Sequence, residues 1–134
     1  MKSLNRVMLI GHLAADPEAR QTKSGISVVN FPIATNHLTK DENGEKKEIV
    51  DFHRIVAWGK LADVCEEYLC KGMAVYVEGR LINRSYEDKD KNRHYMTEIV
   101  IHDLNILTWK KSKSGKEELS IEKLPEGEEE VVEA

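Results

Sequence analysis

Apolar and polar residues alternate along much of this chain, and that alternation limits what the chain can fold into. The alternation is clearest over residues 49–58, where Phe52, Arg54 and Trp58 fall on one face and Ile49, His53 and Ile55 on the other. A period of two residues is typical of a β-strand. Further strands are predicted, in order, at residues 5–13, 20–22, 26–37, 73–82, 94–102 and 104–109. Only residues 60–70 show the apolar spacing of a helix.

The order of these segments predicts the fold class. Three main strands, one helix and two more main strands are the layout of an all-β protein, a five-stranded OB-fold barrel with the helix between strands 3 and 4. With 134 residues the chain can form one such domain, which we place at residues 1–110. Residues 39–47 and 87–93 are polar and predict loops. Residues 111–134 are rich in Lys, Ser, Gly and Glu, which predicts a flexible, disordered acidic C-terminal tail.

The net charge of −4 conceals an asymmetry between body and tail. Up to Lys113 the balance of charged side chains is +2, and from Ser114 onward it is −6. A mildly basic body is compatible with a polyanionic partner, since local clustering decides whether such a partner can dock. No apolar run is long enough to cross a membrane, and the first residues are too short for a leader sequence, so we expect a cytoplasmic protein with no membrane partner.

Catalytic and cofactor-binding patterns are not found. The sequence has no glycine-rich phosphate loop, and its five histidines do not have metal-ligand spacing. Cys65 and Cys70 lie five positions apart on the predicted helix, so we expect neither a disulfide nor a metal site between them. We therefore predict a protein that is not an enzyme and needs no metal or cofactor.

The predicted chemistry is binding, carried by aromatic rings interleaved with cations. Phe52 and Trp58 lie on the third main strand, and Tyr86 follows the fourth. Basic residues flank these rings, namely Arg54, Lys60, Arg80 and Arg84. Unpaired nucleobases stack on such rings at about 1 to 3 kcal/mol per base, and Lys and Arg neutralise phosphates. The alternative is that Phe52 and Trp58 are core aromatics and Arg54 extends past them to water.

Eight segments resemble the bacterial single-stranded DNA-binding protein family, in the same order and at similar spacing. Together they span about residues 1–109. The segments are Asn5–Leu13, Asp16–Glu18, Phe52–Val56, Trp58–Ala62, Glu67–Leu69, Lys71–Gly72, Val75–Leu81 and Thr97–Val100. The resemblance implies an OB-fold that forms a homotetramer and binds single-stranded DNA without sequence preference. It also implies a role in DNA replication, recombination and repair, in association with the bacterial nucleoid.

Carried over by position, the resemblance assigns roles to individual residues. Phe52, Trp58 and Tyr86 match base-stacking positions of the family. Arg54, Lys60, Lys71 and Arg84 match phosphate-contacting positions. His53 matches a histidine at a subunit contact, although without the resemblance the sequence favours a hydrogen-bonded strand histidine.

The sequence departs from the family at two places. Leu38 stands where bacterial members often carry another tryptophan, so one stacking ring is replaced. The acidic tail lacks the proline and phenylalanine with which family members commonly end. We therefore interpret the tail as a solubilising segment rather than one that recruits replication or repair proteins. Two other functions remain open, an OB-fold RNA-binding module or RNA chaperone, and a protein-interaction barrel without a nucleic-acid role.

Overall fold

The structure is a computed structural model that describes residues 1–109 and the backbone of 131–133. The predicted tail falls largely at residues 110–130 and 134, outside the described part of the chain. The elements, in chain order, are β1 (Val7–Leu13), β2 (Glu18–Gln21), β3 (Ser27–Lys40), β4 (Lys46–Trp58), α1 (Lys60–Tyr68), β5 (Ala74–Glu87), β6 (Arg93–Ile106) and β7 (Val131–Glu133).

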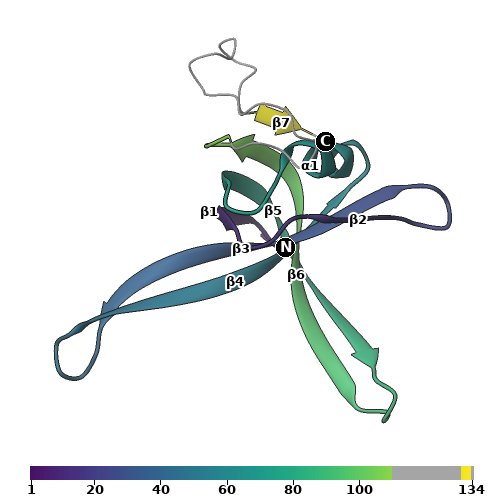
Figure 1. Cartoon of the computed structure of the whole chain (residues 1–134). Helices are drawn as coiled ribbons and strands as arrows, with labels where there is room; N and C mark the ends of the chain where they lie inside the picture. The colour runs from purple at the N-terminus through teal and green to yellow at the C-terminus, as the bar shows by residue number, and fades with distance from the viewer. Residues whose placement is uncertain (110–130, 134) are drawn as a thin grey trace.

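Five of the strands form a closed barrel. Hydrogen-bonded neighbours follow the order β1, β5, β6, β4, β3, and the pairing of β1 with β3 closes the ring. All of these pairs are antiparallel except β4 with β6, which are parallel at Ile55–Ile99 and Val56–Val100. The helix α1 follows β4 and precedes β5 (Figure 1). The predicted OB-fold barrel, with its helix between the third and fourth barrel strands, is confirmed.

The barrel interior is filled by the apolar faces of its strands and by one face of α1. Phe31, Ile33 and Ile55 come from β3 and β4, and Leu61 and Cys65 come from the helix. Each of these side chains is at most 2% exposed, as expected for a close-packed core. None of the described residues form a helix with the length and apolar character that a membrane crossing requires.

Cys65 is a buried thiol, and burial raises its pKa to about 12. Because the thiolate is the reactive form, we expect Cys65 to resist thiol reagents in the folded protein at pH 8. A Cys70→Ser variant isolates Cys65, and colour release from Ellman's reagent should appear only after unfolding in guanidinium. Rapid reaction of the folded variant would contradict this placement of Cys65.

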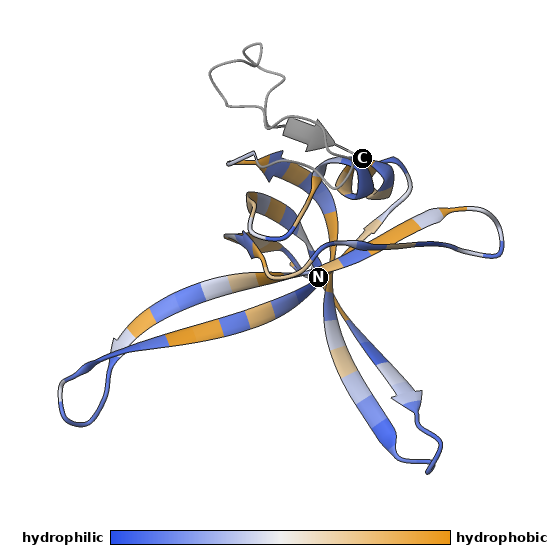
Figure 2. Cartoon of the chain, viewed as in Figure 1, coloured by the Kyte–Doolittle hydropathy of each residue, from blue (hydrophilic) through white to orange (hydrophobic). Residues whose placement is uncertain are grey.

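Two long hairpins extend from the barrel (Figure 1). β3 pairs with β4 from Val28–Trp58 out to Lys40–Lys46, and β5 pairs with β6 out to Glu87–Arg93. Figure 2 shows that the tips of both hairpins are hydrophilic. The two loops are therefore shorter in the structure than the predicted 39–47 and 87–93, because the residues at their ends continue the strands.

The two hairpin tips are built in the same way. Asp41 Oδ1 accepts hydrogen bonds from the backbone N–H groups two and four positions later, and so does Asp88 Oδ1. The residue three positions after each aspartate has a positive φ, 78° at Gly44 and 65° at Lys91. This combination fixes short, defined turns at the ends of the hairpins.

β6 is continuous where the sequence predicted two strands. Glu78 pairs with Asp103 and Gly79 with Ile101, so His102 is an extra residue in β6, a β-bulge. The bulge breaks the alternation, which explains why a separate strand was predicted at 104–109. Asp103, Leu104 and Asn105 also pair with β7.

Candidate nucleic-acid interface

One face of β4 carries the predicted aromatic and basic row. Phe52 is 68% exposed and Trp58 is 36% exposed, while Val56 between them is buried. Arg54 lies between Phe52 and Val56 with its side chain 45% exposed. Tyr86, on the neighbouring hairpin, is 50% exposed. The three rings are therefore not part of the core, and the core-aromatic alternative is wrong for Phe52 and Trp58.

β2 and β3 extend this face. The register places Arg20, Val28 and Trp58 side by side, and Glu18, Asn30 and Val56 form the next row. Arg20 adds a cation that the sequence analysis did not identify as a site residue. The only sequence signal was that Arg20 begins the short strand predicted at residues 20–22.

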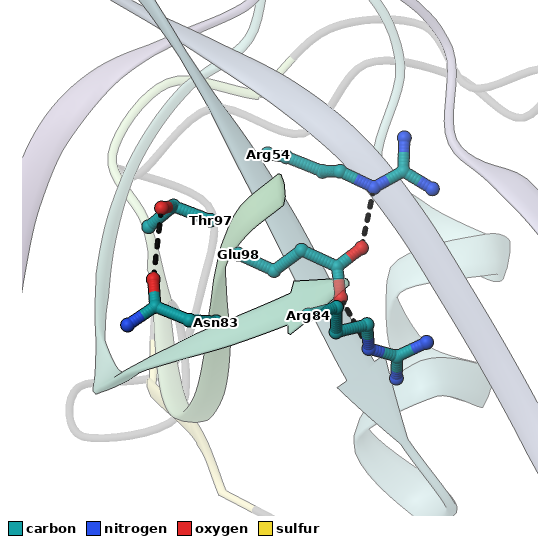
Figure 3. Close-up of polar contacts among 5 residues, drawn as sticks. All are labelled: Arg54, Asn83, Arg84, Thr97 and Glu98. Carbon is teal, nitrogen blue, oxygen red and sulfur yellow. Dashed lines mark hydrogen bonds and ion pairs between the residues drawn. The ribbon is translucent and has the colours of Figure 1, made fainter. Parts of the chain in front are cut away.

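β5 and β6 supply the opposite side of the interface. Arg84 lies on β5 across from Met96, and Glu98 lies across from Ile82, two positions along the same face. Glu98 Oε2 accepts a hydrogen bond of 2.5 Å from Arg54 Nε, and Arg84 Nε lies 2.9 Å from Glu98 Oε1 (Figure 3). This carboxylate joins the two hairpins, and the sequence analysis missed it.

Two neighbouring hollows share Arg54 and Asn30. The first, of about 310 Å³, is lined by Phe52, His53 and Arg54 together with residues that include Glu18 and Asn30. The second, of about 290 Å³, is lined by Arg20, Asn30, Arg54, Val56, Arg84, Ser85, Tyr86, Met96 and Glu98. Each hollow thus combines an exposed ring with at least one guanidinium group.

Tyr86 is not an isolated ring. His94 lies across from it on β6, and the two rings stack with centroids 5.2 Å apart and planes 24° from parallel. His94 Nε2 is 2.6 Å from Asp88 Oδ2. This contact with His94, and then the N–H groups of Asn92 and Asp90, hold the pKa of Asp88 below its usual value. His94 therefore supports the ring of Tyr86, a role that sequence spacing did not indicate.

The remaining predicted site residues lie outside both hollows. Lys60 and Lys71 are exposed at the start of α1 and in the turn before β5, and the backbone N–H of Lys71 donates to Asp16 Oδ1. Arg80 is exposed on the same face of β5 as Arg84. Trp58 shares its row with Arg20, at the margin of the second hollow.

His53 is half-buried, and its Nε2 lies 2.9 Å from Thr35 Oγ1. This contact matches the alternative of a hydrogen-bonded strand histidine.

One group of potential metal ligands is present in the described chain. Glu78, His102 and Asp103 have ligand atoms within 4.8 Å of one another. Arg6 already forms an ion pair with Glu78 Oε1, which supplies the positive charge that this buried carboxylate needs. Nothing else in the group points to an ion.

Comparison with known proteins decides the family. A sequence model described as the single-strand binding protein family matches residues 4–107. The chain belongs to this family. A relative named "Single-stranded DNA-binding protein 1", from Chlorobaculum tepidum, is 53% identical over 120 residues, which cover 89% of this chain and 74% of the relative.

Two solved structures of single-stranded DNA-binding proteins have the same fold. One, a Plasmodium falciparum SSB complex with ssDNA, superposes with a TM-score of 0.74 at 36% identity, over 80% of this chain and 97% of that one. The other is a deletion mutant of the Thermus aquaticus protein, with a TM-score of 0.68 and 31% identity over 78% of this chain and 50% of that one.

Proposed function

We propose that this protein binds single-stranded DNA without sequence preference and protects it during DNA replication, recombination and repair. The observation that carries the proposal is the pair of hollows that meet at Arg54, each with an exposed ring and a guanidinium group. The Plasmodium falciparum relative of the same fold, which was solved as a complex with ssDNA, supports the choice of ligand.

The chemistry of these residues favours unpaired strands. A base can stack on the exposed face of Phe52, Trp58 or Tyr86 only when it is released from a duplex. Stacking does not depend on which base is presented, so the interface does not select a sequence. Arg54 and Arg84 lie between the rings and would neutralise the phosphates that link successive bases.

The positive surface extends beyond the hollows through Lys60, Lys71 and Arg80, and Arg20 adds a cation at the margin of the second hollow. We propose that they contact the strand as it leaves Trp58 and the two hairpins. Such exposed cations contribute mainly through counterion release, so their effect on affinity should decline steeply with salt.

We also propose that the protein acts as a homotetramer in the bacterial cytoplasm, associated with the nucleoid. The outer face of β1 presents Met8 and Ile10, 60% and 64% exposed, which suits burial against another subunit. His53 is proposed to contact a neighbouring subunit, as its match in the family does. Light scattering on the purified protein tests this part, and a monomer at micromolar concentration would contradict it.

Tryptophan emission provides the first test of DNA binding. Trp58 is exposed at the interface, while Trp109 packs edge-on against Tyr68 with centroids 5.8 Å apart. Titration with oligo(dT) at low salt should therefore quench emission, and the quenching should come mainly from Trp58. A Trp58→Phe variant keeps a stacking ring and should lose most of the quenching while still binding a fluorescently labelled oligo(dT).

The same titration separates the alternatives. Unchanged emission and no binding of labelled oligo(dT) at low salt would contradict the proposed function and favour a protein-interaction barrel. Equal affinity for oligo(U) and oligo(dT) would favour an RNA-binding module. Quenching that persists in Trp58→Phe would place the DNA elsewhere on the barrel.

A further inference from the structure

Glu98 is a buried carboxylate within the surface that we propose binds DNA. It is 3% exposed, and Glu78 is the other buried charged residue in the described part of the chain. Burial of a carboxylate is costly unless it is paired, and a negative charge beside bound phosphates opposes their binding. A role for Glu98 must offset both effects.

The geometry around Glu98 indicates such a role. Each carboxylate oxygen faces one arginine, Oε2 facing Arg54 of β4 and Oε1 facing Arg84 of β5. Both arginines approach through Nε, and Figure 3 shows their terminal Nη groups pointing away from the carboxylate. The two side chains are 45% and 48% exposed, so these terminal groups are accessible.

We infer that Glu98 is a positioning residue for DNA binding. It holds Arg54 and Arg84 at the second hollow, so that their Nη groups are presented to phosphates before DNA arrives. Glu98 itself contacts no DNA. The inference rests on the proposed function, which it deepens by assigning the two guanidinium groups a fixed, shared orientation.

Two roles for Glu98 predict opposite effects of its neutralisation on DNA affinity, namely pre-orientation of the two arginines and simple reduction of the positive charge. Ordering one long side chain on binding weakens association roughly two- to twelvefold, so loss of the shared anchor should weaken binding. If Glu98 only reduced the positive charge of the interface, its neutralisation would strengthen binding and steepen the salt dependence. The sign of the change therefore distinguishes the two roles.

The opposite face of the same hairpin offers a structural control. Thr97 Oγ1 donates a 2.9 Å hydrogen bond to Asn83 Oδ1, across the β5–β6 pair and next to Glu98 in sequence. Thr97→Val removes this bond without reaching either hollow. Any general loosening of the hairpin would appear in this variant as well.

The experiment compares Glu98→Gln, Thr97→Val and Glu66→Gln with the unaltered protein. Glu66 is exposed on α1, so its substitution makes the same change in net charge away from the two hollows. Polarisation of labelled oligo(dT) is measured over a series of salt concentrations. Glu98→Gln should bind about tenfold more weakly than Glu66→Gln, with no steeper salt dependence, and Thr97→Val should bind as the unaltered protein does.

Arg54→Lys and Arg84→Lys keep the inference testable if Glu98→Gln does not fold. Lysine keeps the charge but cannot pair with Glu98 through one nitrogen and present others outward. Both variants should bind several-fold more weakly, and wild-type affinity in both would overturn the inference. Glu98→Gln binding at least as tightly as Glu66→Gln would also overturn it. No binding by the unaltered protein would instead overturn the proposed function.

Discussion

Removal of two exposed rings in a Phe52→Ala/Tyr86→Ala variant is expected to weaken oligo(dT) binding by about 2 to 6 kcal/mol, at least roughly 30-fold in Kd. The reason is that each ring lines one of the two hollows that meet at Arg54. Both rings are at least half exposed, so the substitutions remove stacking surface and leave the core intact. Polarisation of labelled oligo(dT) at fixed salt measures the change.

Tyr95 provides the matched control for this loss. It lies next to His94 on β6 and is 78% exposed, but the register places it across from Ser85, on the face opposite Tyr86. Tyr95→Ala should therefore change the affinity by less than about twofold. If Tyr95→Ala weakened binding as much as the Phe52→Ala/Tyr86→Ala variant does, the DNA would not follow the face that we describe.

Gly79→Ala should destabilise the fold by about 3 kcal/mol or more, at the upper end of the cost of overpacking a core. A Cβ at this position would lie 2.1 Å from the backbone oxygen of Val100 and 2.7 Å from Cα of Ile101. These atoms belong to β6 beside its bulge, so the backbone itself would have to move. Urea unfolding followed by circular dichroism measures the free energy of unfolding.

Gly25→Ala separates this clash from the general cost of losing a glycine. Gly25 has a φ of 86°, but nothing lies within 4 Å of the position that its Cβ would take. Its substitution should cost only about 1 to 2 kcal/mol, from backbone conformation alone. Equal losses in the two variants would contradict the proposed role of close packing at Gly79.

The barrel was predictable from the sequence because its strands have one buried face. Over residues 49–58 the alternation was visible, and it correctly placed Phe52, Arg54 and Trp58 on a common face. The far ends of the hairpins, at residues 38–40, 46–48 and 83–87, were not predicted as strand, since nearly all of these residues are exposed and leave little apolar period to detect. The strand ends near Lys40 and Glu87 were therefore assigned to loops.

The candidate site was only partly predictable, for a related reason. Rings and cations have recognisable side chains, and the family resemblance added Lys71. Glu98 and Arg20 join the site through the pairing of strands that are far apart in sequence, and nothing in the local pattern around either residue indicates the partner. The sequence assigned no role to His94, because its stacking on Tyr86 depends on the β5–β6 register.

The closure of the barrel also sets when the protein can fold during synthesis. β1 pairs with β5, and β4 pairs with β6 through residues 44 positions apart, as Arg54 and Glu98 also are. Because these contacts are so distant along the chain, a ribosome must release almost the whole domain before the ring can close. Until then the edges of β1 and β4 have no partners from β5 and β6, and unpaired strand edges of this kind are the sites at which chains aggregate.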